Sequence, residues 1–97
     1  MHQVTIIEQA LLPEQDAYCS TCTYDQSGLK IWVLVTGQAI RDLNRFDCDL
    51  NAITKYAVEW ALRQGITEGE VSLAPNAPEF SRFTTWLTEV FQKKRDG

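Results

Sequence analysis

The sequence predicts an α+β domain in which an antiparallel sheet of three or four strands carries helices on one face. Two observations predict this class. Residues 4–36 show strand-like composition broken by turn signals. In most of residues 38–92, by contrast, the apolar side chains recur at helical three- and four-residue spacing. The predicted order is three strands, two helices, one strand and one helix. Strands grouped early with helices grouped late favour such a layered arrangement over an alternating parallel sheet.

The first three strands follow one another closely. Residues 4–12 mix β-branched and apolar side chains and end at Pro13, where proline and the polar residues after it favour a turn. Residues 17–24 are rich in Tyr, Thr and Cys, and residues 25–28 (Asp-Gln-Ser-Gly) have turn chemistry. The third strand alternates Leu29, Ile31, Val33 and Val35 with Lys30, Trp32, Leu34 and Thr36. One of its faces is therefore apolar and the other is mixed.

The middle of the sequence predicts two helices and a strand. A short helix over residues 38–46 places Ile40, Leu43 and Phe46 on one side. A second helix begins after Asp47 or Asp49, either of which can cap it, and Gly65 stops it. Its apolar residues recur at helical intervals at Leu50, Ile53, Tyr56, Ala57, Trp60 and Ala61. Residues 70–74 then predict a short strand.

The last helix has a recognisable start signal. Asn76 can cap it, Glu79 stands three positions later in the reciprocal capping position, and Pro78 lies in the first turn. Its apolar stripe consists of Phe80, Phe83, Leu87, Val90 and Phe91. Lys93, Lys94 and Arg95 follow, where cations meet the negative end of the helix dipole.

Composition limits the function classes. A length of 97 residues with 44% hydrophobic residues predicts one domain, residues 1–97, with one core. No apolar run approaches the roughly 18 residues that span a bilayer, so we expect no membrane span. The net charge is −4, and basic residues cluster only at residues 93–95, so we expect no nucleic-acid partner. Three cysteines and a start without secretory-signal features favour the cytoplasm and reduced thiols.

The spacing of Cys19 and Cys22 is that of redox pairs and metal knuckles. However, both lie in a predicted strand, where positions three apart point to opposite faces. A structural zinc site needs four ligands, and only Cys48 and His2 remain as further soft candidates. We therefore expect no metal and no cofactor, and a metal or redox module using the three cysteines stays an alternative.

Catalytic residues are hard to assemble from this sequence. Nucleophilic catalysis needs a base beside a Ser, Thr or Cys, and the only histidine is His2, in a terminal segment of the kind that is often mobile. No glycine-rich phosphate loop is present. We therefore expect a non-enzymatic protein, and a small hydrolase or transferase stays a second alternative.

The aromatic residues favour an interaction surface. If helices cover only one sheet face, Trp32 and Leu34 on the other face meet solvent or a partner. The predicted protein-binding residues are the anchors Trp32, Leu34 and Trp86 and the acidic residues Asp42, Asp47, Glu68 and Glu70, which would steer a basic partner. The sequence thus predicts a small acidic protein that acts through protein contacts, as an accessory protein, an inhibitor, a regulatory subunit or a homodimer.

Overall fold

A computed structural model describes residues 2–96, with side chains described up to residue 93. The predicted contact of Lys94 and Arg95 with the helix dipole lies outside the described side chains. The elements are β1 (Val4–Leu12), a 3-10 turn (Pro13–Gln15), β2 (Ala17–Tyr24), β3 (Ile31–Thr36), α1 (Gly37–Asp42), a second 3-10 turn (Leu43–Phe46), α2 (Leu50–Arg63), β4 (Gly69–Leu73) and α3 (Pro78–Asp96).

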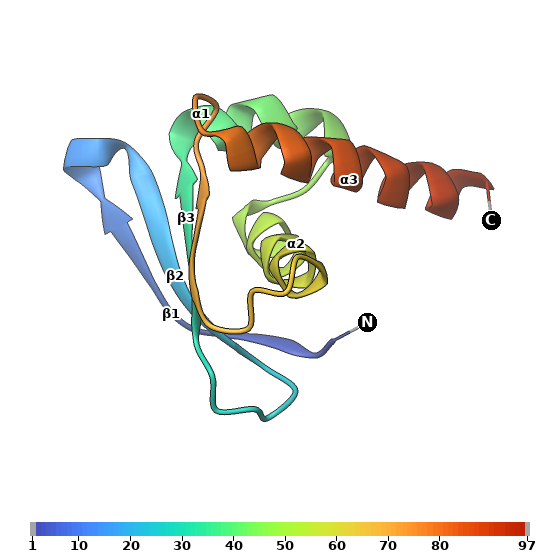
Figure 1. Ribbon diagram of the computed structural model, residues 1–97. Coiled ribbons are helices and arrows are strands. Elements are labelled where there is room, and N and C mark those ends of the chain that lie inside the picture. Colours follow the sequence, from blue (N-terminus) through green and yellow to red (C-terminus); the bar gives the residue numbers. More distant parts are fainter. Residues whose placement is uncertain (1, 97) are drawn as a thin grey trace.

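The four strands form one sheet in the order β1, β2, β3, β4, with the helices on one side of it (Figure 1). The α+β class and the element order are confirmed. The prediction of a purely antiparallel sheet is wrong at one strand, because β4 runs parallel to β3. The chain leaves β3, passes through α1 and α2, and re-enters the sheet from the end at which β3 began. Such a helical crossover brings the next strand in parallel.

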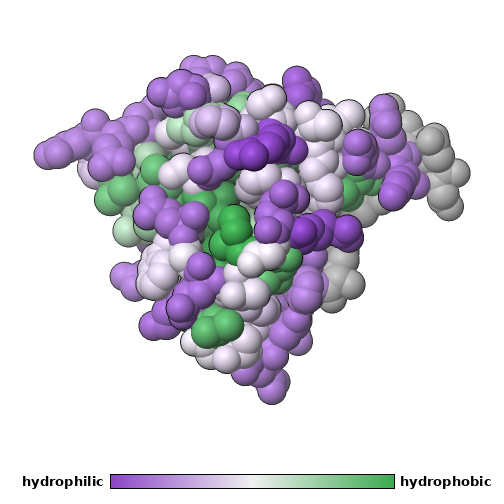
Figure 2. All heavy atoms as spheres, viewed as in Figure 1, coloured by the Kyte–Doolittle hydropathy of each residue, from purple (hydrophilic) through white to green (hydrophobic). Residues whose placement is uncertain are grey.

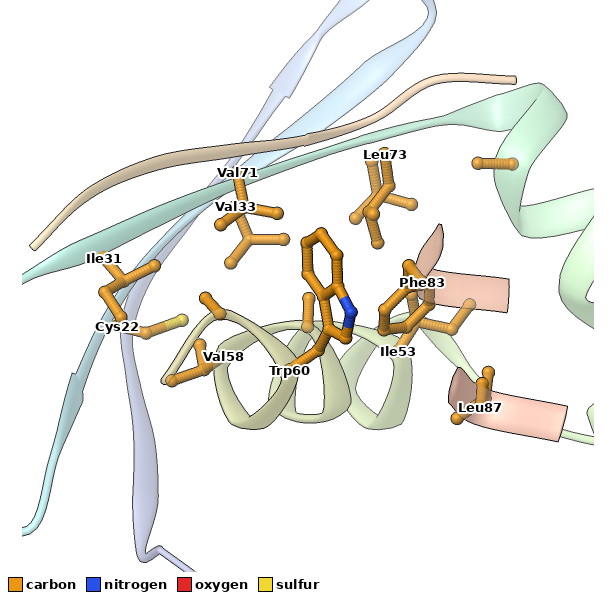
Figure 3. Close-up of a cluster of buried hydrophobic side chains, with 14 of the residues drawn as sticks. Cys22, Ile31, Val33, Ile53, Val58, Trp60, Val71, Leu73, Phe83 and Leu87 are labelled. Atoms are coloured by element: carbon orange, nitrogen blue, oxygen red, sulfur yellow. The ribbon is translucent and has the colours of Figure 1, made fainter. Parts of the chain in front are cut away.

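The core lies between the inner face of the sheet and the helices. Ile31, Val33 and Val35 of β3 are at most 1% exposed, as the alternation of that strand predicts. They face buried residues of α2 and α3, and the ring of Trp60 extends from α2 into this layer (Figure 3). Trp60 meets Phe83 of α3 edge to face, with ring centroids 6.0 Å apart. In the view of Figure 2, hydrophobic residues gather where the sheet and the helices meet, and hydrophilic residues surround them.

The boundaries of α2 follow its sequence signals. Of the two predicted caps, Asp49 is the one used, and its Oδ1 accepts the amide of Ala52 at 2.8 Å. Asp47 instead closes the preceding 3-10 turn in the left-handed conformation. Gly65 follows the helix with φ +83°, a conformation that favours glycine. The helix predicted over residues 38–46 is divided into α1 and a tighter 3-10 turn.

The predicted capping box at the start of α3 is not formed. Glu79 Oε2 accepts the amide of Ser72 at 3.1 Å instead of returning to the residue that caps the helix. Ser72 lies in β4, one of the two edge strands of the sheet. The carboxylate therefore supplies an acceptor to an edge amide and ties α3 to β4.

We predict that Asp49→Ala lowers the free energy of unfolding by about 1 kcal/mol, because the Ala52 amide loses its acceptor. Asp49→Asn keeps a side-chain oxygen at the cap and retains most of the stability. Urea unfolding followed by circular dichroism measures both. Equal losses in the two variants would show that the cap is not the source of the effect.

Candidate functional site

The sheet face that points away from the helices, here called the outer face, carries the exposed tryptophan. The strand register places its side chains in rows across the sheet. One row consists of Glu8, Thr21, Trp32 and Glu70. The next row consists of Ala10, Cys19, Leu34 and Ser72. Trp32 is 39% exposed and Leu34 is half-buried.

The outer face combines apolar and acidic groups. Burial raises the pKa of the Cys19 thiol, and the carboxylates of Glu70 and Glu8 raise it further, which indicates that both lie near this sulfur. No Lys or Arg occupies a paired outer-face position of the described strands. The indole of Trp32 therefore has Glu8 on one side of it along the row and Glu70 on the other. Aromatic rings and carboxylates both bind cations, so this arrangement suits a positively charged ligand.

Glu8 was missed by the sequence analysis because of a β-bulge. Val4 and Ile6 lie opposite Tyr24 and Cys22, whose side chains belong to the core. Regular alternation would put Glu8 on that inner face as well. The register shifts between Ile6 and Glu8, so Glu8 lies opposite Thr21 on the outer face. A run of two β-branched residues before a charge was the only sequence signal, and it does not locate a bulge.

The structure brings together only part of the predicted binding residues. Trp32, Leu34 and Glu70 lie on the outer face, and exposed Glu68 lies in the segment that leads into β4. Trp86 belongs to the helical layer instead.

Trp86 packs among α2 and α3 side chains. Its ring lies 6.3 Å from that of Tyr56 and 6.0 Å from that of Phe83, and the guanidinium of Arg63 lies over it. The two remaining acidic residues are also away from the outer face. Asp42 accepts a hydrogen bond from Gln38 in α1, and Asp47 precedes α2.

The two cysteines of the C-x-x-C spacing point to opposite faces, as predicted. Cys19 lies opposite Leu34 on the outer face, and Cys22 is buried opposite Ile31. Burial raises the pKa of Cys22 to about 11. Cys48 lies apart from them, just before α2. Among the described residues, no group of three His, Cys, Asp or Glu side chains could hold a metal ion.

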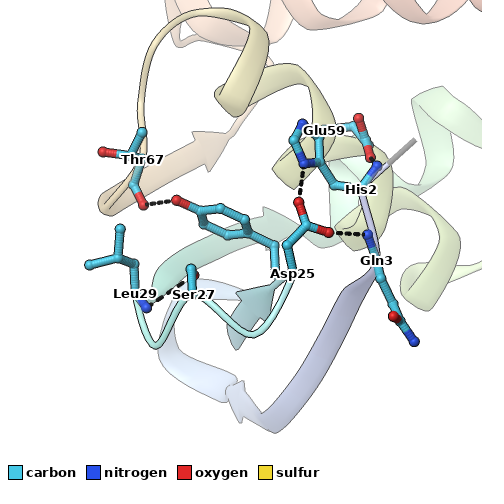
Figure 4. Close-up of polar contacts among 8 residues, drawn as sticks. His2, Gln3, Asp25, Ser27, Leu29, Glu59 and Thr67 are labelled. Carbon is cyan, nitrogen blue, oxygen red and sulfur yellow. Dashed lines mark hydrogen bonds and ion pairs between the residues drawn. The ribbon is translucent and has the colours of Figure 1, made fainter.

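A second feature is a groove of about 400 Å³ between residues 2–4 and α2. Its helical wall consists of Ala52, Lys55, Tyr56 and Glu59. The His2 ring contacts Asp25 through Nδ1, and the Glu59 carboxylate accepts the backbone amide of His2 (Figure 4). Asp25 also accepts the Gln3 amide at 2.7 Å, and these hydrogen bonds, first of all that from His2, lower the pKa of Asp25. His2 is therefore held in place by Asp25 and Glu59.

Comparisons of the chain with protein-family models, with curated protein sequences and with solved structures find no match. None of the described helices has the length and apolar character needed to cross a membrane.

We predict that mild oxidation of the folded protein forms no disulfide between Cys19 and Cys22, because the two sulfurs lie on opposite sides of the sheet. Iodoacetamide at neutral pH should label both slowly, and Cys22 last, since their raised pKa values keep them as thiols. Peptide mass spectrometry reads both results, and the denatured chain provides the control. A Cys19 to Cys22 disulfide in the native protein would contradict the strand geometry.

Proposed function

We propose that the protein is a non-enzymatic binding protein whose outer face takes a basic segment of a protein partner. The observation that supports this most is the position of Trp32, which is 39% exposed in one row with Glu8 and Glu70. No described helix packs on that face (Figure 1). Single exposed hydrophobic side chains are common on protein surfaces, whereas an indole framed by carboxylates is a specific combination.

The row spacing suits an arginine side chain. Glu70 lies on the strand adjacent to Trp32, about 5 Å away across the sheet, and Glu8 lies two strands away, at about 10 Å. A guanidinium stacked on the indole can reach the nearer carboxylate, and a second cation of the same segment can reach the other. The neighbouring row of Ala10, Cys19 and Leu34 offers apolar contact to the aliphatic parts of such side chains.

Charge favours this partner over a second copy of the chain. A dimer formed face to face would bring Glu8 and Glu70 of one copy against the carboxylates of the other, and like charges brought together in an interface cost free energy. A basic segment meets the opposite charge at both positions. The net charge of −4 adds long-range attraction for it.

The proposed role is that of an accessory protein, an inhibitor or a regulatory subunit, and the proposed compartment is the cytoplasm. Among the described residues, no disulfide bond joins any of the three cysteines, which supports a reducing compartment. The alternative of a metal or redox module at Cys19, Cys22 and Cys48 has less support, because the first two thiols diverge. For the small hydrolase or transferase, none of the described residues that line the groove bordered by His2 is a Ser, Thr or Cys.

A hexa-arginine peptide tests the proposal by isothermal titration calorimetry. We expect saturable binding that Trp32→Ala weakens about 10-fold, in line with the loss of a cation–π contact of about 1 to 2 kcal/mol. Glu70→Gln should weaken binding several-fold. Asp42→Asn removes an exposed carboxylate away from the outer face and is the matched control.

Two results would contradict the proposed surface. One is binding that Trp32→Ala leaves unchanged. The other is an equal effect of Asp42→Asn and Glu70→Gln, which would show that the net charge of the protein, and not the outer face, causes the binding. A hexa-lysine peptide that binds as tightly as hexa-arginine would argue against stacking on the indole, because the planar guanidinium stacks on aromatic rings and the ammonium does not.

A further inference from the structure

We propose that the groove between residues 2–4 and α2 binds a small zwitterion of the α-amino-acid type. This site lies on another part of the molecule than the outer face and is independent of the function proposed above. Its volume of about 400 Å³ falls within the range of small-molecule sites. The distribution of charge with depth in the groove supports this class of ligand.

The groove is negative at its base and positive at its mouth. Glu59 is only 4% exposed, Tyr56 is half-buried, and Lys55 is exposed. Lys55 and Glu59 are four residues apart on α2, so they lie on the same side of the helix. Neither forms an ion pair within 4.0 Å among the described residues. Two opposite charges therefore line one groove without neutralising each other in a direct pair.

The buried carboxylate of Glu59 has an uncharged hydrogen-bond partner. This carboxylate accepts a hydrogen bond from the neutral backbone amide of His2. A buried carboxylate gains more from a cation, because removal from water is costly unless an opposite charge compensates it. An ammonium group that enters the groove supplies that charge while the His2 amide keeps its acceptor.

The wall opposite α2 is fixed before any ligand arrives. The His2 ring is held by Asp25 and meets the edge of the Tyr24 ring, with ring centroids 6.0 Å apart. The Gln3 amide is bound to the same aspartate. Such preorganisation reduces the ordering cost of binding. Val4 and Ala52 add apolar surface for the carbon atoms of the ligand.

These charges select a molecule that carries both signs. A simple carboxylate would pair with Lys55 but would meet repulsion from Glu59. A simple ammonium ion would pair with Glu59 but would meet repulsion from Lys55 at the mouth. A zwitterion that enters with its ammonium group first meets an opposite charge at each depth, which favours it over either single ion.

L-alanine is the probe, with propionate and ethylammonium as analogues that each lack one of its charged groups. Chemical shifts in ¹⁵N spectra of the full chain measure the binding. We expect saturable shifts at the amides of His2, Gln3 and Glu59 with alanine, and affinities about 10-fold weaker for either analogue, which corresponds to about 1.4 kcal/mol.

Substitutions separate this site from a structural role of Glu59. Glu59→Gln keeps an oxygen for the His2 amide and removes the charge, so it should weaken alanine binding about 10-fold. Lys55→Gln should weaken it several-fold with an unchanged melting temperature, because Lys55 is exposed. Lys30→Gln is the matched control, since Lys30 is also exposed and does not line the groove. If Glu59→Gln unfolds the protein, the alanine affinity of Lys55→Gln tests the proposal instead.

Three results would overturn the proposal. The first is the absence of saturable shifts with alanine. The second is equal binding of propionate, which would leave only an anion contact at Lys55. The third is an equal loss of affinity in Lys30→Gln and Lys55→Gln, which would show that net charge alone is responsible.

Discussion

The packing of helices against a single face of β3 is the constraint on which the rest of the structure depends. Ile31, Val33 and Val35 are buried under α2 and α3. Because side chains alternate along a strand, this burial sends Trp32 and Leu34 to the opposite face. A second helical layer would have covered them. The same apolar stripe that stabilises the core therefore determines which aromatic residue stays accessible.

Strand β1 contributes to both inferred surfaces, and its bulge divides their roles. Before the bulge, the first residues of the chain lie against α2 and form one wall of the groove. After it, the alternation is inverted and Glu8 joins the row of Trp32 on the outer face. A bulge inserts one residue and re-aims the side chains that follow it. One extra residue near Ile7 thus places a carboxylate on the outer face, in the row of the exposed indole and two strands away from it, instead of on the inner face.

Local signals were readable from the sequence, and long-range pairings were not. The bounds of β1 and β2, the Asp49 cap and the Gly65 stop all follow from neighbouring residues. The parallel direction of β4 depends on where the crossover returns, which no local pattern encodes. Other misses have the same cause, since Glu79 binds a strand amide and His2 is held by Asp25 and Glu59 from distant parts of the chain.

The relative accessibility of the Trp32 and Trp60 indoles tests the central claim most directly. In a solution of the free protein, a soluble paramagnetic agent broadens NMR signals according to their exposure. We expect strong broadening of the Trp32 indole, whereas the indole of Trp60, 4% exposed in the core, keeps its intensity as an internal reference. Protection of Trp32 equal to that of Trp60 would contradict a one-sided helical layer with an open outer face.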